Sequence, residues 1–288
     1  MSKAGFFVTY SRRKLRSGSG PRLVWAIFLA GASICLPHQG RAAGIGAPSI
    51  EPVARPNVAE QYLLDAANSE RIGRGLKPLR RDANLSQAAR YHAQQMALHG
   101  DISHRFPDEP DLTQRGSKAG ARFSRISENV AEAPTSAMIH DLWMRSSGHR
   151  KNLLDPDVDA VGIAVVTRGA QTYAVEDFAS SVQTLSYDEQ ERIVSDALAR
   201  QGLSVGPDRL TSSLEDARRT CNAQTGYGGT SRKPRYIIRF TSSSLNELPL
   251  VLQKKIESGQ YRKAVVGACR DAGTGSFTDY NIAVLLYP

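Results

Sequence analysis

The pattern of apolar residues between positions 58 and 181 limits the fold most, because its period changes from helical to extended along the chain. Apolar side chains recur first at helical spacing and later in short runs of β-branched residues. The expected elements are helices over 58–72, 85–99 and 135–146, then strands over 161–167 and 172–179. Helices followed by a hairpin predict a single α+β unit.

The sequence also indicates where these helices end. Pro78 lacks an amide donor and restricts Lys77, so it ends the first helical region. Gly100 can end the second helix by taking a left-handed conformation. Residues 100–127 are polar and without clear period, which predicts an irregular loop that lines a cleft.

The last hundred residues predict a second, smaller α+β unit over residues 187–288. Helices fit 188–201 and 245–257, and strands fit 236–240, 264–268 and 280–287. The string Ala264-Val265-Val266-Gly267 echoes Asp159-Ala160-Val161-Gly162, which raises the possibility of a reused hairpin. One echo of this length is too short to establish a repeat.

The amino-terminal residues have the pattern of an export signal. A basic stretch precedes an apolar run over 23–36, and Gly40-Arg41-Ala42 offers small residues for cleavage. The apolar run has about 14 residues, fewer than the roughly 20 that cross a bilayer, which disfavours an uncleaved anchor. We therefore predict a signal peptide over 1–42, a linker over 43–57 and a secreted or periplasmic protein with no transmembrane segment after leader removal.

The net charge of +9 belongs mostly to this leader. Seven of the 37 basic residues and none of the 28 acidic residues lie within 1–42, so the remainder carries a net charge of only +2. A nucleic-acid-binding protein normally concentrates basic residues in its folded part. The charge distribution therefore argues against a nucleic-acid partner.

Cysteine usage agrees with export. Cys35 would leave with the leader, and Cys221 and Cys269 would remain. An even number of cysteines in an oxidising compartment predicts a disulfide between them. The alternative is a pair of buried free thiols.

A series of short strings in residues 60–179 resembles the CAP superfamily of cysteine-rich secretory proteins, antigen 5 and pathogenesis-related proteins. The order and the spacing of the strings make the resemblance specific, although each string alone is weak. They are Asn68-Ser69-Glu70-Arg71, Gly75-Leu76-Lys77-Pro78-Leu79, Ala89-Arg90-Tyr91-His92-Ala93, Ser103-His104, Ser127-Glu128-Asn129-Val130, Trp143 to Leu154, Val161-Gly162-Ile163 and Tyr173 to Phe178. The resemblance implies an α-β-α sandwich over residues 58–181.

The resemblance also implies a cleft. Members of this family typically place two histidines and two acidic residues there, and His104, Glu128 and His149 fall at three of these positions. The position of the second glutamate, three residues after the tryptophan, is Ser146 in this chain. This substitution matches a variant of bacterial members and weakens any acid–base mechanism that needs two carboxylates.

The residue types suggest a chemistry for the cleft. Neutral imidazoles of His104 and His149 could bind zinc or another divalent metal, with Glu128 as a third ligand or as the group that orients a bound water. The alternative is that the histidines only hydrogen-bond Glu128 and Ser146. We interpret the other three histidines of this unit, His92, His99 and His140, as core or surface residues of their helices.

Two classes of function remain open. The first is a binding module for a metal or for a lipid, a glycan or another extracellular ligand. The second is a hydrolase, either a protease or a cell-wall-modifying enzyme, with metal-activated water and Glu128 as the base. The missing second carboxylate and the absence of recognisable nucleophile, zinc-protease and phosphate-binding motifs favour binding.

Overall fold

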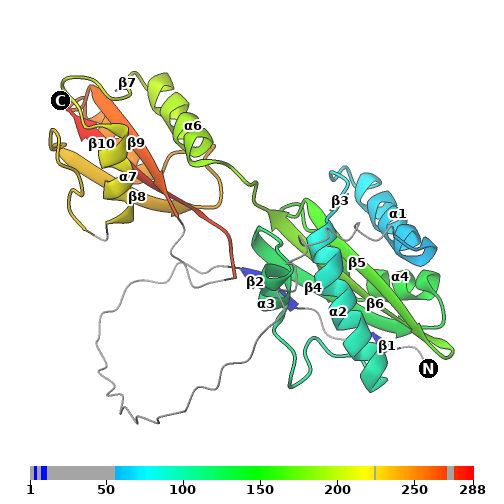
Figure 1. The fold of residues 1–288 in the computed structure, drawn as a ribbon. Helices are drawn as coiled ribbons and strands as arrows, with labels where there is room; N and C mark the ends of the chain where they lie inside the picture. The colour runs from blue at the N-terminus through cyan, green and yellow to red at the C-terminus, as the bar shows by residue number, and fades with distance from the viewer. Residues whose placement is uncertain (1–2, 5–7, 12–55, 224, 271–275) are drawn as a thin grey trace, which may run out of the picture. The chain divides into compact units, whose positions relative to one another are not determined.

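The computed structural model describes residues 3–4, 8–11, 56–223, 225–270 and 276–288 (Figure 1). The predicted leader and linker lie almost wholly outside these residues. Two short strands near the amino terminus, β1 (Lys3–Ala4) and β2 (Val8–Ser11), pair antiparallel with strand β4 (Phe123–Ala133). None of the helices in the described part of the chain is both long and apolar enough to cross a membrane.

Strand β4 belongs to the first sheet, which contains both parallel and antiparallel strand pairs. Its other strands are β3 (Arg80–Arg81), β5 (Ala160–Arg168) and β6 (Gln171–Ser181), in the spatial order β4-β6-β5-β3. Strand β3 runs parallel to β5, whereas β5–β6 and β4–β6 are antiparallel. Successive side chains of each strand point to opposite faces of the sheet.

Helices cover both faces of this sheet (Figure 1). On one face lie α1 (Val58–Ile72), α4 (Ser136–Arg145) and α5 (Ser147–Leu153), whose Leu63, Trp143 and Leu153 pack with Phe178 of β6. On the other lie α2 (Ala83–His99) and α3 (Leu112–Lys118). This is the α-β-α sandwich that the resemblance implied.

The three helices and the hairpin predicted for residues 58–181 are confirmed, each within two residues of its expected ends. Gly100 ends α2 with a φ of 67°, as predicted. The prediction of an irregular segment over 100–127 is wrong, because it contains α3 and the start of β4. Helix α3 has a single large apolar side chain, Leu112, and β4 is buried on both faces, so neither shows a clear period.

The described residues of the span 187–288 form a second sheet of four strands with three helices. Its strands are β7 (Ser204–Val205), β8 (Tyr236–Ser242), β9 (Lys263–Cys269) and β10 (Tyr280–Tyr287), and its helices are α6 (Tyr187–Arg200), α7 (Leu214–Asn222) and α8 (Leu250–Glu257). Helix α7 was missed because its sequence is strongly polar. The predicted start of α8 at residue 245 is wrong, because Pro249 stands at its amino-terminal cap.

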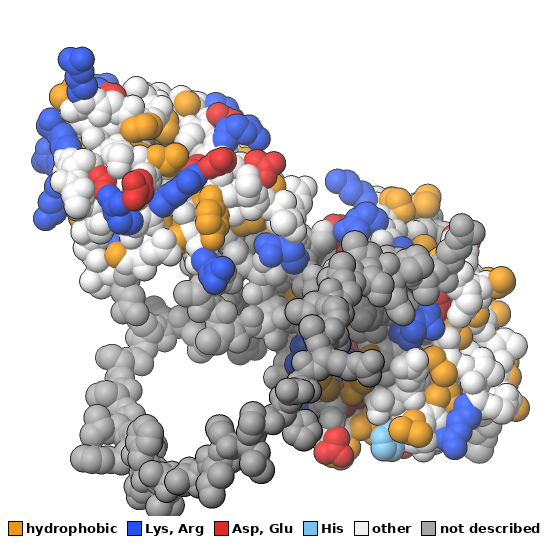
Figure 2. Space-filling view, viewed as in Figure 1, with side chains coloured by type: hydrophobic (Ala, Val, Ile, Leu, Met, Phe, Trp, Pro, Cys, Tyr) orange, Lys and Arg blue, Asp and Glu red, His pale blue; other side chains and the backbone are white. Residues whose placement is uncertain are grey.

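Charged side chains of both signs share the surface of this second unit. Figure 2 shows acidic side chains lying among basic ones on the face that it displays. An ion pair of 3.0 Å joins Arg192 to Asp196, and Arg218 pairs with Glu191 at 2.7 Å. The positive charge of this unit is therefore partly compensated where the two signs meet.

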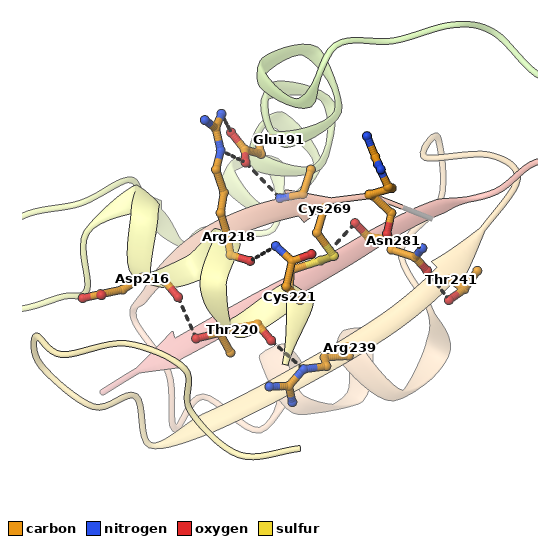
Figure 3. Close-up of a disulfide and its surroundings, with 12 residues drawn as sticks. Glu191, Asp216, Arg218, Thr220, Cys221, Arg239, Thr241, Cys269 and Asn281 are labelled. Carbon is orange, nitrogen blue, oxygen red and sulfur yellow. Dashed lines mark hydrogen bonds and ion pairs between the residues drawn. A yellow bond between two sulfur atoms is a disulfide. The ribbon is translucent and has the colours of Figure 1, made fainter. Parts of the chain in front are cut away.

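The predicted disulfide is present in this unit. Cys221 of α7 and Cys269 at the end of β9 are joined with an S–S distance of 2.06 Å and a Cα–Cα distance of 5.7 Å. The bond ties the helix to the sheet, beside the pair of Arg218 with Glu191 (Figure 3). A covalent link here restricts the unfolded chain over a separation of 48 residues.

Replacing both Cys221 and Cys269 by serine should lower the free energy of unfolding of this second unit by about 3 kcal/mol, in the usual range for a native disulfide. Chemical unfolding followed by circular dichroism measures the loss. Trp143, the only tryptophan outside residues 1–42, lies in the first unit, so its fluorescence transition should not move. Equal stability of the serine variant and the parent would refute a stabilising role for the bond.

Candidate functional site

A hydrogen bond joins two of the predicted site residues, His104 and Glu128. His104 lies in the loop between α2 and α3, and Glu128 lies in the middle of β4 with no exposed surface. The Nδ1 atom of His104 is 2.6 Å from Oε1 of Glu128. The fold therefore brings together two residues that are 24 positions apart in the sequence.

The carboxyl of Glu128 is held in its ionised form. Burial alone would raise its pKa, but the positive charges of His92 and Arg115 and the hydrogen bond from His104 outweigh burial and lower the pKa to about 2. A carboxylate only accepts hydrogen bonds, so Nδ1 of His104 must donate. The lone pair of neutral His104 is then on Nε2.

The Nε2 atom of His104 is buried and has no hydrogen-bond partner among the described residues. A buried polar atom without a partner is costly, and such atoms mark places where a ligand, an ion or a water is expected. The carboxylate of Glu128 on Nδ1 fixes the orientation of the His104 ring, as in histidines that bind metals or act as bases. The arrangement thus presents one oriented acceptor atom.

Arg115 of α3 connects Glu128 to the loop that carries His104. One terminal nitrogen of its guanidinium contacts Oε2 of Glu128. The other donates to the backbone oxygens of His104 at 3.1 Å and of Pro110 at 3.2 Å. A single buried side chain therefore fixes both the carboxylate and the backbone of the histidine that it orients.

His92 of α2 holds the same loop at a second point. Its Nε2 donates to the carbonyl oxygen of Ser103 at 2.7 Å, and its Nδ1 lies 2.7 Å from Oε1 of Glu109. The ring is fully buried and its Nε2 is 3.8 Å from Glu128. His92 is thus a core residue, as predicted, but no sequence pattern indicated that it also holds the segment around His104 in place.

A second carboxyl lies beside Glu128. Asp177 of β6 is the direct cross-strand partner of Glu128 and is fully buried on the same face of the sheet. Burial, together with repulsion from Glu128, raises the pKa of Asp177 well above its ordinary value. The alternation of β6 places positions 175, 177 and 179 on one face, but only the cross-strand register sets Asp177 beside Glu128.

The other two predicted residues belong to the junction of α4 and α5. Ser146 separates the two helices, and its backbone amide donates to Leu142 and Trp143. His149 is buried in α5, and its carbonyl oxygen accepts a hydrogen bond of 3.1 Å from the side chain of Asn129. The α5 segment is therefore tied to β4 at the residue that follows Glu128.

Few side chains near His104 are available as metal ligands. Within the residues that the structure describes, no group of three or more His, Cys, Asp and Glu side chains is placed to hold a metal ion. Both oxygens of Glu128 already contact protein groups, one His104 and the other Arg115. A divalent ion would therefore bind through Nε2 of His104, with further ligands from outside this contact set.

A protein-family model matches the part of the chain that holds the site. The model described as "CAP: Cysteine-rich secretory protein family" matches residues 64–183. This segment is similar to the CAP family, and we call it the CAP domain below. The CAP domain contains all four predicted cleft residues, whereas residues 187–288 lie outside the match.

Curated relatives match part of this chain. The uncharacterized protein YkwD of Bacillus subtilis is 32% identical over 112 residues, which are 38% of this chain and 44% of the relative. The uncharacterized membrane protein YlbC of the same organism is 29% identical over 111 residues, 37% of this chain and 31% of the relative. The chain therefore spans less than half the length of these relatives.

Solved structures that resemble the chain include surface and extracellular proteins. An extracellular protein with an SCP domain from Bacillus anthracis is 27% identical, with a TM-score of 0.39, and the match covers 42% of this chain and 40% of that chain. A cysteine-rich secretory protein from Staphylococcus aureus is 23% identical, with a TM-score of 0.36 and coverage of 43% and 39%.

Proposed function

We propose that the CAP domain is an exported binding module whose cleft takes a ligand or a divalent metal ion at Nε2 of His104. The observation that carries this proposal is the buried Nε2 atom, which has no partner in the described structure while Nδ1 is fixed by Glu128. Such a histidine is prepared to donate its lone pair without further reorganisation.

Zinc is the probe that suits this atom best. Imidazole nitrogen is a common zinc ligand, and a carboxylate on the other ring nitrogen raises its basicity. His149, from α5, is the proposed second ligand, as its place in the CAP motif implies. Glu128 acts as a positioning residue rather than as a ligand, since both of its oxygens contact protein groups.

Replacing His104 by alanine should abolish zinc binding, and replacing His149 by alanine should weaken it, because each change removes a proposed ligand. Calorimetric titration with zinc measures both effects.

The matched control for this titration is His140→Ala, which removes a buried histidine of α4 that the cleft does not use. It should bind zinc as the parent does. Equal affinity of the parent and of the His104 variant would show that the metal site lies elsewhere. Absence of zinc binding by the parent would reject a metal and leave a metal-free ligand as the form of the proposal to pursue.

A hydrolase that uses the same cleft is the second candidate. Two observations favour it: Glu128 orients His104 as a carboxylate orients a catalytic base, and Asp177 supplies the second carboxyl that position 146 lacks. Hydrolysis of a protein or cell-wall substrate that is lost in His104→Ala would support this candidate over binding alone.

Export should remove the leader, so the mature protein should begin near Ala43. The basic stretch, the apolar run and the small residues around Arg41 motivate this expectation. Amino-terminal sequencing of the protein from the medium or periplasm tests it. A chain that keeps residues 1–42, or that stays in the cytoplasm, would be incompatible with an exported binding module.

A further inference from the structure

The two sheets of this chain share one topology. In the CAP domain the strands lie in the order β4-β6-β5-β3, and in the second unit in the order β8-β10-β9-β7. Strands β3, β4, β5 and β6 of the first sheet therefore correspond to β7, β8, β9 and β10 of the second. The directions also agree, since β7 is parallel to β9 as β3 is to β5, and the remaining neighbours are antiparallel in both sheets.

The helices occupy corresponding places as well. Helix α6 and helix α8 share one core cluster and cover one face of the second sheet, as α1 and α4 do in the CAP domain. Helix α7 packs on the opposite face, as α2 does. Parallel strand pairs with a crossover are almost always right-handed, so the same connections give the same hand in both units.

A glycine marks the same contact in both units. A Cβ atom added to Gly162 of β5 would lie 2.1 Å from the carbonyl carbon of Leu85 in α2. A Cβ atom added to Gly267 of β9 would lie 2.3 Å from the carbonyl carbon of Ala217 in α7. In each unit the helix touches the strand that follows the parallel crossover, and only glycine leaves room for it.

We propose that residues 187–287 are a second, divergent CAP-fold domain, so that the chain carries the fold twice. The family model matches only the first copy, and the second retains the order of its strands, the faces of its helices and the strand glycine. The short echo between residues 159–162 and 264–267 lies at this glycine.

The second copy has lost the chemistry of the cleft. The cross-strand row through Gly162 contains Asp177 and Glu128, whereas the row through Gly267 contains Ala283 and Arg239. Arg239 donates its Nε hydrogen to the backbone oxygen of Thr220 at 2.8 Å. A cation therefore stands where the first copy has the carboxylate that orients His104, and the sequence of the second copy contains no histidine.

The position of the disulfide in the second copy predicts where an engineered disulfide should form in the first copy. Cys269 follows Gly267 by two residues, as Ala164 follows Gly162. Cys221 follows Ala217 by four residues, as Ala89 follows Leu85. Ala89 and Ala164 are fully buried and belong to one core cluster, so the pair that corresponds to the native disulfide already lies on facing elements.

The double variant Ala89→Cys/Ala164→Cys of the whole chain should form a second disulfide with oxidised glutathione, detected by mass spectrometry as a cross-linked peptide. The control Ala89→Cys/Val165→Cys places the second thiol on the opposite face of β5 and should stay reduced. Native fluorescence of Trp143 verifies that each variant is folded.

Each result of this cross-linking experiment either supports or overturns the duplication. A cross-link in the first variant and none in the control supports the duplication, because the copies then share the register of helix and strand. Free thiols in a folded first variant would overturn it. If the variants do not fold, superposition of the two units in an experimental structure decides: β7 to β10 must fall on β3, β4, β5 and β6 in the stated correspondence, with α7 on α2.

Discussion

Replacing Glu176 by glutamine should stabilise the CAP domain at pH 8 and leave its stability at pH 4 nearly unchanged. Glu176 lies in β6, is fully buried, and neither carboxyl oxygen has a hydrogen bond of normal geometry in the described structure. Burial raises its pKa from 4.5 to about 8, and the nearby amide of Asn129 offsets only part of that rise.

The direction of the effect follows from linkage. A raised pKa in the folded protein stabilises it fully below the unfolded value near 4.5, and this stabilisation is lost as the pH rises to about 8. Each pKa unit corresponds to about 1.4 kcal/mol, so the loss approaches about 5 kcal/mol at pH 8. Glutamine has nearly the same shape and cannot ionise, so it avoids this loss.

Chemical unfolding followed by Trp143 fluorescence at pH 4, 6 and 8 measures the difference between parent and variant. Glu70→Gln is the control, because Glu70 forms only a partly exposed pair with Arg74 and should change stability by less than about 1 kcal/mol at each pH. A Glu176 variant that is less stable than the parent at pH 8 would mean that the native carboxylate is ionised and paired.

Replacing Arg115 by methionine should lower the free energy of unfolding of the CAP domain by about 4 kcal/mol, because it leaves Glu128 buried without the guanidinium that contacts it. Arg115 is 3% exposed and contacts Glu128, the backbone of His104 and the backbone of Pro110. The exposed Lys118 of the same helix is the control, and Lys118→Met should change stability by less than about 0.5 kcal/mol.

A second substitution tests whether the pairing with Glu128 is the cause. The variant Arg115→Met/Glu128→Gln removes the unpaired charge, so it should be more stable than Arg115→Met alone. A double variant that is no more stable than the single one would assign the loss to the backbone contacts of Arg115. Unfolding curves of the parent, both single variants and the double variant complete this comparison.

The sequence predicted those parts of the fold that repeat an apolar pattern. Helix α1 and the β5–β6 hairpin combine a regular period with clear ends, and their bounds were correct within two residues. Helix α3 and strand β4 were missed because Arg115, Glu128 and Asn129 are buried polar residues that interrupt any apolar period. These exceptions are the residues that build the site.

Only part of the site could be predicted from the sequence. His104 and Glu128 could be chosen because they stand in motif strings that resemble the CAP family. Asp177 and Arg115 could not, since their roles depend on the cross-strand register and on the direction of α3. A sequence contains no local signal for either, because both are long-range consequences of the fold.

The crystal structure of the exported protein soaked with zinc would test the proposed site at His104. We expect density for a metal about 2.0–2.1 Å from Nε2 of His104, with Glu128 still bound to Nδ1 of His104 and to Arg115. Without zinc, an ordered water or ligand should occupy the same place. A donor from the protein itself on Nε2, with no ion or ligand beside it, would contradict the proposed binding site.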